Sequence, residues 1–289
     1  MFIATLIAKE RLTRGDISAA ADALGGVAGE QWIEDGHACD LQLIDSPTGA
    51  RAALEGLLSD VDVVVQPAAH RRKRLLVADM DSTMITVECI DELADYAGLK
   101  AEVAEVTERA MRGELDFEAA LDARVALLKG LDEAAIDRCR AERVRLAPGA
   151  RALVRTMRAN GAYALLVSGG FTRFAGPVAE EIGFDAQRSN ILEVEAGRLT
   201  GTVARPIVGA AAKRESLLEA AASRAIPLDA TLAVGDGAND IPMIEAAGLG
   251  VAYHAKPATA AAADARIEAN DLTALLYAQG YARKDWVEA

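Results

Sequence analysis

The chain has 289 residues, a length that allows two domains or one large domain with an insertion. Hydrophobic residues make up 52% of it, as in a globular protein, yet no apolar run approaches the roughly 20 residues of a membrane span. The net charge of −13 disfavours nonspecific binding to nucleic acid over most of the surface. Residues 1–4 lack the basic start of a secretion signal, so we expect a cytoplasmic protein that binds neither nucleic acid nor membrane.

Residues 1–70 are predicted to form a small α/β domain. Strand-like stretches at residues 2–8, 38–44 and 61–65 alternate with helical stretches at 13–24 and 48–58. This βαβαβ order predicts an open sheet with helices on one face. The basic residues 70–74 follow, and we interpret them as a solvated boundary between domains.

A helical insertion is predicted after the first strand of the second domain. The apolar residues 75–78 resemble a buried strand of a parallel sheet. Helical spacing then recurs at residues 88–96, 102–112, 117–129 and 133–143, with glycines between the stretches. Four helices in succession interrupt a strand–helix alternation, so residues 86–147 are expected to be an inserted helical subdomain.

Strand–helix alternation resumes at residue 148. Helices are predicted at residues 150–159, 174–182, 211–224 and 241–247, and strands at 163–167, 231–234 and 250–253. Residues 191–203 are expected to form a hairpin that turns at Ala196 and Gly197. The repeated order predicts an α/β fold with a doubly wound parallel sheet, built by residues 71–85 and 148–289.

Polar residues follow three of these strands. They are Asp79 and Asp81 after the first, Ser168, Gly169 and Gly170 after the second, and Asp236, Asn239 and Asp240 after the third. The carboxyl ends of parallel strands lie at one edge of a sheet, where ligands bind. Carboxylates so close together repel each other unless a cation or a shared proton compensates. Hard oxygen ligands without nearby histidine or cysteine indicate Mg²⁺.

Two further features suit a phosphate group. Ser168 with its two glycines offers a hydroxyl and approachable backbone amides. Lys213 lies in the helix before the strand of Asp236, where its ammonium would offset the charge of a metal-bound phosphate.

These stretches, in this order, resemble the four motifs of the haloacid dehalogenase superfamily of aspartyl-phosphate phosphatases, over residues 75 to about 285. The chain is similar to the members that act on phosphoserine, through Glu88, residues 111–117, Arg124 and residues 127–129. The resemblance implies a Rossmann-like core with a helical-bundle cap. Residues 1–70 resemble an ACT-like regulatory module.

The resemblance implies a role for each residue at the strand ends. Asp79 would attack phosphorus, and Asp81 would act as general acid and then general base. Mg²⁺ would be held by Asp79, Asp236 and the main-chain carbonyl of Asp81. The phosphate-binding and supporting residues would be Ser168, Gly169, Lys213 and Asn239, with Gly170 beside them and Asp240 orienting the metal shell.

Substrate choice is expected to fall to the cap. Glu88 would pair with the ammonium of O-phospho-L-serine, and Arg124 would grip its carboxylate. Met111 and Phe117 would close the pocket and exclude water.

The implied function is magnesium-dependent hydrolysis of O-phospho-L-serine to L-serine and phosphate, the last step of serine biosynthesis. The substrate is the expected partner, and a homodimer is allowed. One alternative is a phosphatase or phosphotransferase of the same superfamily that uses phosphothreonine or phosphohomoserine. Another is a non-enzymatic amino-acid sensor, against which the intact Asp79, Asp81, Lys213 and Asp236 argue.

Overall fold

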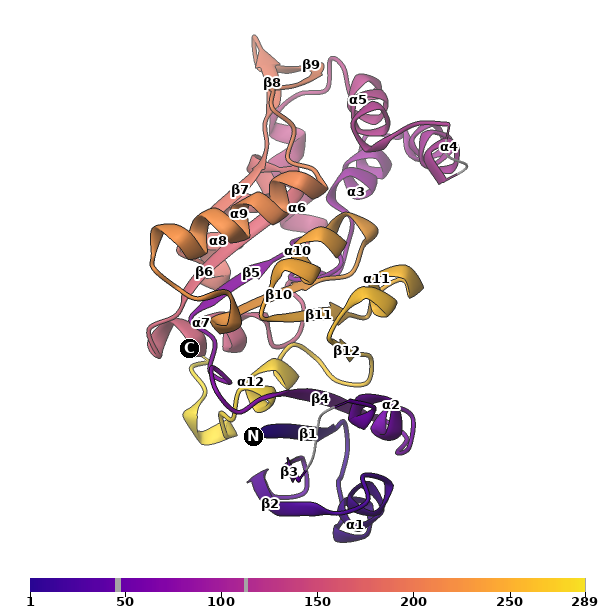
Figure 1. Cartoon of the computed structure of the whole chain (residues 1–289). Coiled ribbons are helices and arrows are strands. Elements are labelled where there is room, and N and C mark those ends of the chain that lie inside the picture. The colour runs from indigo at the N-terminus through magenta and orange to yellow at the C-terminus, as the bar shows by residue number, and fades with distance from the viewer. Residues whose placement is uncertain (45–47, 112–113, 289) are drawn as a thin grey trace.

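The computed structural model describes residues 1–44, 48–111 and 114–288, without the side chains of Ala110 and Met111. Within these residues the chain forms a six-stranded sheet, a four-stranded sheet and a two-stranded hairpin. In Figure 1 the four-stranded sheet lies at the bottom, the six-stranded sheet in the middle and the hairpin at the top. No helix of the described residues is both long and apolar enough to cross a membrane.

The six-stranded sheet is parallel throughout, with the strand order β12-β11-β10-β5-β6-β7. In chain order its strands are β5 (Leu75–Ala78), β6 (Tyr163–Phe171), β7 (Ala186–Asn190), β10 (Thr231–Gly235), β11 (Leu249–Tyr253) and β12 (Ala265–Ile267). The helices that pack with it are α7 (Ala150–Ala159), α8 (Thr172–Ile182), α9 (Ala210–Ser223), α10 (Ile241–Ala246), α11 (Pro257–Ala262) and α12 (Ala274–Ala278).

Strand β5 shows why this sheet needs helices on both faces. Its side chains alternate between two hydrophobic clusters, and all four are fully buried. Leu75 and Val77 belong to the cluster that includes α9 and α10. Leu76 and Ala78 belong to the cluster that includes α7, α8 and α12. The predicted doubly wound parallel sheet is therefore confirmed.

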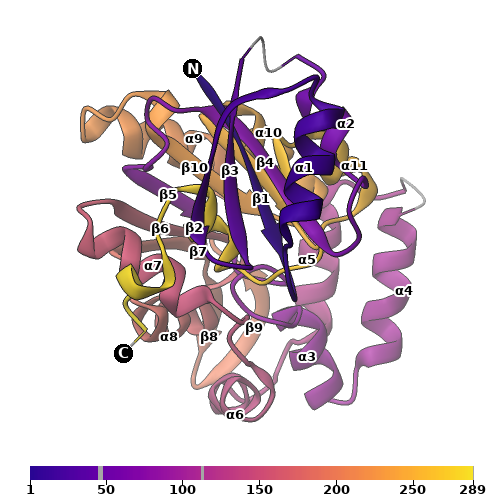
Figure 2. The same cartoon turned by 90° about the horizontal axis from the view of Figure 1, so that it is seen from below.

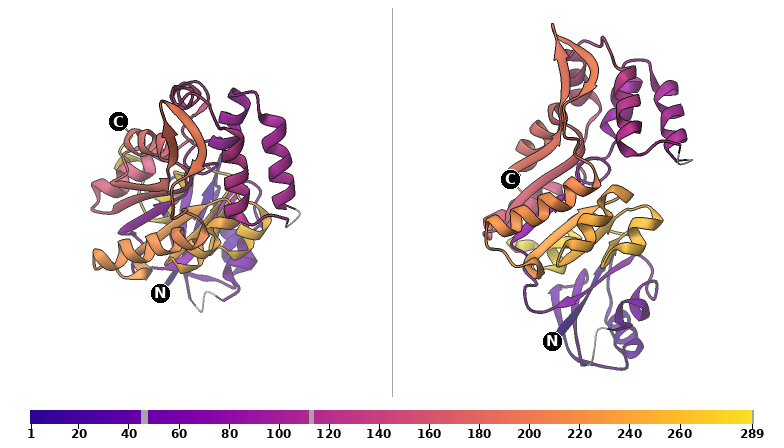
Figure 3. Two further views of the ribbon diagram at one scale, coloured as in Figure 1. Left: turned by 90° about the horizontal axis from the view of Figure 1, so that it is seen from above. Right: turned by 45° about the horizontal axis from the view of Figure 1, so that its top comes forward.

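Four helices separate β5 from the rest of this sheet, as the sequence predicts. They are α3 (Cys89–Tyr96), α4 (Lys100–Met111), α5 (Phe117–Leu127) and α6 (Ala134–Arg143). The hairpin of β8 (Leu192–Glu195) and β9 (Arg198–Val203) lies beside α5 (Figure 1). The residues after α5 join it, since Gly130 N donates to Leu199 O at 2.8 Å and Leu199 N donates to Leu131 O at 2.9 Å. Both views of Figure 3 show α3, α4 and α5 grouped on one side of the molecule.

The N-terminal sheet is antiparallel, with the order β2-β3-β1-β4, and Figure 2 looks onto it. Its elements are β1 (Phe2–Ala8), α1 (Arg14–Ala23), β2 (Val27–Glu34), β3 (Ala38–Leu43), α2 (Ala50–Leu54) and β4 (Val61–Pro67). The order is therefore βαββαβ, and the predicted βαβαβ order is wrong because it omits β2. Part of the loop before α2, residues 45–47, lies outside the described residues.

The two faces of the N-terminal sheet have different partners. Ala4 and Leu6 of β1 share a cluster with Ile17 of α1, whereas Ile7 belongs to the cluster of the parallel core. The core-facing side is also polar, since Asp62 of β4 accepts hydrogen bonds from the backbone N–H groups of residues 268–270, at 2.9 to 3.1 Å.

Of the basic residues 70–74, which the sequence analysis interprets as a solvated boundary, His70, Arg72 and Arg74 are exposed, whereas Arg71 is half-buried and Lys73 is buried. Arg71 forms an ion pair with buried Asp40 at 2.5 Å and donates to Ala278 O at 2.9 Å. Lys73 is 4% exposed, and its ammonium donates to Asp229 O at 2.9 Å. Arg71 joins the two sheets because it has acceptors in both domains, whereas the Lys73 side chain is buried against the turn before β10.

Candidate active site

A cavity of about 320 Å³ lies at the carboxyl edge of the parallel sheet, between the strand ends and helices α3 and α5. Its lining includes most of the residues that the sequence predicts: Asp79, Asp81, Glu88, Phe117, Arg124, Gly169, Gly170, Asp236 and Asn239. Lys213, Ser168 and Asp240 lie just beneath the lining and are fully buried. The side chain of Met111 is outside the described part of the chain.

The centre of the site is a buried charge cluster. The ammonium of Lys213 lies 2.7 Å from Asp79 Oδ1 and 2.6 Å from Asp240 Oδ1. Burial disfavours the ammonium, but the two carboxylates outweigh that effect and raise the pKa of Lys213. Burial raises the pKa of Asp79, and the negative charge of Asp240 adds to the rise, while Lys213 opposes it. Lys213 is therefore a fixed cation between two acids.

Asp240 is held by the turn that follows β10. Its Oδ2 accepts from the backbone N–H groups of Asp236 at 3.2 Å and Gly237 at 3.0 Å. This fold-back needs a glycine at position 235, because a Cβ there would lie 2.4 Å from Asp240 Cγ. Both oxygens of Asp240 are thus occupied, and it positions the loop and Lys213.

Asp79 and Asp236 keep a carboxylate oxygen without a partner among the described residues. Asp79 Oδ1 accepts from Lys213 and, at 2.7 Å, from Met80 N. Asp236 Oδ1 accepts from Thr83 Oγ1 at 3.3 Å. Each aspartate's Oδ2 faces none of the described donors, while carboxylate oxygens of Asp79, Asp236 and Asp240 lie within 4.8 Å of one another. Carboxylates at this spacing, two of which keep an unpaired oxygen, fit a small divalent cation such as Mg²⁺.

The C-terminal part of β6 has the features of an oxyanion site. Ser168, Gly169 and Gly170, predicted to follow the strand, lie within it, where the pairing with β7 is interrupted between Val167 and Phe171. Ser168 Oγ accepts from Gly170 N at 2.8 Å. A side chain at position 170 would clash, because its Cβ would lie 2.8 Å from Asp81 Oδ2. Gly169 contacts the ring of Phe117, whose Cζ would be 3.2 Å from an added Cβ. Gly169 and Gly170 therefore line the cavity with their backbone, and the ring of Phe117 lies against Gly169.

Asp81 is placed to hold a proton. Its Oδ1 accepts from Cys89 N, the first residue of α3, at 3.1 Å. Burial and the nearby charge of Glu88 raise the pKa of Asp81 to about 7, although the hydrogen bond to Cys89 opposes the rise. A carboxyl group with such a pKa can give and take a proton near neutral pH.

Helices α3 and α5 bring opposite charges to the mouth of the cavity. Glu88 is exposed at the start of α3, and its Oε1 accepts from Ser82 Oγ at 2.7 Å. Arg124 of α5 is half-buried and makes a hydrogen bond to Ala120 O at 3.3 Å through Nε. Among the described residues its other guanidinium donors have no hydrogen-bond partner, so they can bind an anion in the cavity.

Six lining residues are not among those that the sequence analysis names: Ile90, Leu121, Phe171, Gly237, Ala238 and Lys256. Ile90 and Leu121 supply apolar walls from α3 and α5, and Lys256 adds a cation near Asp236. Lys256 N donates to Asp236 O at 3.1 Å, which ties the loop after β11 to the site. Ile90 and Leu121 follow ordinary helical spacing, and Lys256 is a single loop lysine, so no local pattern distinguishes them.

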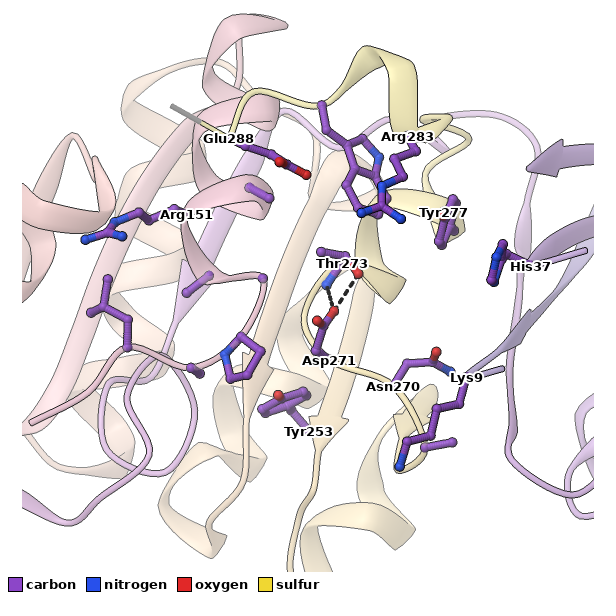
Figure 4. Close-up of a pocket in the computed structure, with 18 of the residues that line it drawn as sticks. Lys9, His37, Arg151, Tyr253, Asn270, Asp271, Thr273, Tyr277, Arg283 and Glu288 are labelled. Atoms are coloured by element: carbon purple, nitrogen blue, oxygen red, sulfur yellow. Dashed lines mark hydrogen bonds between the residues drawn. The ribbon is translucent and has the colours of Figure 1, made fainter. Parts of the chain in front are cut away.

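A second, larger cavity of about 960 Å³ lies between the N-terminal domain and the parallel core. Figure 4 shows Lys9 and His37 of the N-terminal domain at the right, and Tyr253 and Asp271 of the parallel core nearer the centre. Asp271 Oδ1 accepts a hydrogen bond from Thr273 N at 2.8 Å. The lining of this cavity includes none of the candidate site residues that the sequence analysis names.

Comparison with known proteins agrees with this geometry. Residues 76–245 match the family model of the haloacid dehalogenase-like hydrolases. A phosphoserine phosphatase of Streptomyces coelicolor is 45% identical over 84% of this chain and 59% of its own length. That of Albidiferax ferrireducens is 49% identical over 70% of this chain and 88% of its own length.

The structural comparison extends the similarity to nearly the whole chain. The unliganded crystal structure of a probable phosphoserine phosphatase from Vibrio cholerae has 35% sequence identity and a TM-score of 0.79. The match covers 98% of this chain and 87% of that one. The chain spans less than two thirds of the Streptomyces relative, 59% of its length. The family resemblance is confirmed: the chain belongs to the haloacid dehalogenase-like hydrolases and, within them, to the phosphoserine phosphatase family.

Proposed function

We propose that this chain hydrolyses O-phospho-L-serine to L-serine and phosphate. The observation that supports this most directly is the buried Lys213–Asp79 pair, which lies below a cavity with Glu88 and Arg124 at its mouth. Phosphate, ammonium and carboxylate are the three charged groups of the substrate, and the site offers a complementary group for each. The relatives that bear the name phosphoserine phosphatase support the same substrate.

The proposed reaction has two steps. The Asp79 carboxylate attacks phosphorus and forms an aspartyl-phosphate while the bond from phosphorus to the serine oxygen breaks. Asp81 gives its proton to the departing serine oxygen. Water then attacks the aspartyl-phosphate, Asp81 takes a proton from that water, and phosphate is released from regenerated Asp79.

The charge of the phosphoryl group needs a fixed cation close by. Lys213 is already held by Asp79 and Asp240, so it does not have to reorganise when the substrate binds. Ser168 and the backbone of Gly169 are proposed to contact the other phosphoryl oxygens, with Asn239 at the edge of the cavity.

Mg²⁺ is the proposed cofactor. Asp79 and Asp236 would hold it through their unpaired oxygens, with the main-chain carbonyl of Asp81 as a third ligand. When bound, it would neutralise part of the phosphate charge and polarise the phosphorus centre. Asp240 supports this site from behind through the turn at Asp236 and Gly237.

Helices α3 to α6 are proposed to act as a cap that selects the substrate. Glu88 would bind the ammonium, Arg124 would bind the carboxylate, and Phe117 would shield the phosphoryl group from water. Met111 stays a predicted member of this cap.

One assay tests the proposal against its rivals. Phosphate release is measured from O-phospho-L-serine, phosphothreonine and phosphohomoserine, with Mg²⁺ and with a chelator. We expect the first substrate to have the highest kcat/KM and the chelator to abolish turnover. Higher kcat/KM on another phospho-amino acid would make the chain a different phosphatase of the superfamily, and no turnover at all would favour an amino-acid sensor.

Three further expectations remain predictions: an ACT-like role for residues 1–70, a homodimer and a cytoplasmic location. Titration calorimetry with L-serine, on the full chain, tests the ACT-like role. Light scattering tests the homodimer.

A further inference from the structure

The backbone of Ser82 adopts an uncommon conformation beside the active site. Its φ is +55°, in the left-handed region that is unfavourable for most residues and that glycine and asparagine usually occupy. Ser82 follows Asp81 directly, and its side chain is half-buried. A strained serine next to a catalytic carboxylate needs a reason that its side chain can supply.

The conformation brings the Ser82 hydroxyl to Glu88. Ser82 Oγ donates to Glu88 Oε1 at 2.7 Å, across six residues of chain. Ser82 N donates to Val87 O at 3.3 Å, and Asp81 Oδ1 accepts from Cys89 N at 3.1 Å. Three hydrogen bonds thus close the loop from Asp81 to Cys89, and the one from Ser82 Oγ joins two side chains, with Glu88 at the mouth of the cavity.

Glu88 depends on this contact because its own helix does not hold it. It is the N-cap residue of α3, yet its side chain accepts no capping hydrogen bond. It is exposed, and within the described residues Ser82 is its one hydrogen-bond donor. Without that bond, a flexible side chain with several rotamers would have to be ordered by the substrate alone.

We propose that Ser82 is a positioning residue for recognition of the substrate ammonium, acting through Glu88. The hydroxyl fixes one carboxylate oxygen and leaves Oε2 to face the ligand. The inference rests on the proposed function, since it assumes that Glu88 binds the ammonium of O-phospho-L-serine. Removing the hydroxyl should therefore weaken binding of a substrate with an ammonium and spare one without it.

A pair of ligands isolates this effect. O-phospho-L-serine and 3-phosphoglycerate share the phosphate ester and the carboxylate, but the second has a hydroxyl where the first has its ammonium. For each variant, KM and kcat are measured from serine release, and 3-phosphoglycerate is used as a competitive inhibitor to obtain Ki.

For Ser82→Ala we expect KM for phosphoserine to rise about tenfold, as for loss of one hydrogen bond to a charged group, with kcat and Ki changed less than twofold. Ser82→Gly relieves the backbone strain without restoring the hydroxyl, so it should show the same rise. Ser82→Asn tolerates positive φ and can donate to Glu88, so it should recover most of the affinity. Thr86→Ala, an exposed residue of the same loop that bonds only Arg145 O, is the matched control and should leave KM and Ki unchanged.

The KM and Ki values of these variants distinguish a positioning role of Ser82 from a purely structural one. Equal increases of KM and Ki in Ser82→Ala, or full recovery in Ser82→Gly, would mean that Ser82 merely shapes the loop, and the inference would be wrong. An unchanged KM in Ser82→Ala would also overturn it. Failure of the proposed function is seen separately, as absence of turnover of phosphoserine by the unmodified chain.

Discussion

The ammonium of Lys213 lies 2.7 Å from Asp79 Oδ1 in a site where neither side chain is more than 7% exposed. A buried cation that touches the proposed nucleophile keeps that carboxylate oriented before any substrate arrives. Because Lys213 also contacts Asp240 at 2.6 Å, it stays paired when Asp79 loses its charge.

Asp79→Asn should therefore abolish activity without unfolding the protein. The amide cannot form the acyl phosphate, so phosphate release should fall by at least about 10³-fold. Lys213 keeps Asp240 as partner, so we expect Tm to change by only a few degrees. Phosphate release and thermal unfolding are measured together, with Asp122→Asn, a partly exposed residue of α5, as control. Activity above a few per cent in Asp79→Asn would contradict the nucleophile assignment.

Metal-dependent stability should grow with pH. Burial, with the charge of Asp240, raises the pKa of Asp236 to about 6, and burial raises that of Asp81 to about 7. Since both exceed the unfolded value of 3.8, the stability that these groups contribute is present below pH 4 and is lost as pH rises through 6 to 7. Mg²⁺ competes with the proton on its carboxylate ligand Asp236, so its stabilising effect should be larger at pH 8 than at pH 5.5.

Thermal shifts with and without Mg²⁺ at the two pH values measure this dependence. Asp236→Asn should remove most of the shift at pH 8, while Asp35→Asn, an exposed acid of the N-terminal domain, should leave it intact. An equal shift at both pH values would place the metal elsewhere.

Arg124→Ala should lose selectivity for the substrate carboxylate. Charge-assisted hydrogen bonds are worth about 1.5–3 kcal/mol, so kcat/KM for phosphoserine should fall about 10- to 100-fold. Phosphoethanolamine, which lacks the carboxylate, should be turned over as before. Arg138→Ala on the exposed side of α6 is the control. A parallel loss with both substrates would mean that Arg124 only supports the cap.

Asp62→Ala should weaken the contact between the N-terminal sheet and the core. Three backbone N–H groups and the Asn270 side chain lose their acceptor, and unsatisfied buried donors cost about 1–3 kcal/mol each before water compensates. We expect the free energy of unfolding in urea to fall by about 2–4 kcal/mol with little change in activity at low temperature. Asp35→Ala should have no such effect, and equal stability of the two variants would contradict the role of Asp62.

The sequence analysis predicted the strands and helices that hydrophobic patterning specifies. It missed the elements and contacts that depend on partners far away in the chain. Strands β5 and β10 are apolar runs buried on both faces, so their type and position follow from composition. Strand β2 was missed because its residues are mostly exposed or half-buried at a sheet edge, with no apolar alternation. Strand β12 has three residues, too few for any periodic signal.

In the candidate site, too, the residues that follow a local pattern were predicted and those that depend on distant partners were not. Acids after apolar strands identified Asp79 and Asp236, since topology brings such positions to one edge. The contribution of Lys256 could not be predicted, because it depends on a backbone hydrogen bond to Asp236 across 20 positions of chain. Burial of Arg71 and Lys73 likewise depends on acceptors that the chain supplies far away in sequence.

Residues 55–66 of the N-terminal domain and residues 266–278 of the core satisfy each other's polar groups. Glu55 pairs with Arg266 at 2.5 Å, Asp62 caps residues 268–270, and Gln66 donates to Ala278 O at 2.7 Å, each over more than 200 positions. The N-terminal sheet is synthesised before residues 266–278, so one of its faces has no partner until that segment emerges from the ribosome. Closure of this junction must therefore follow synthesis of that segment, and a nascent chain halted before residue 260 would still present the uncovered face to chaperones.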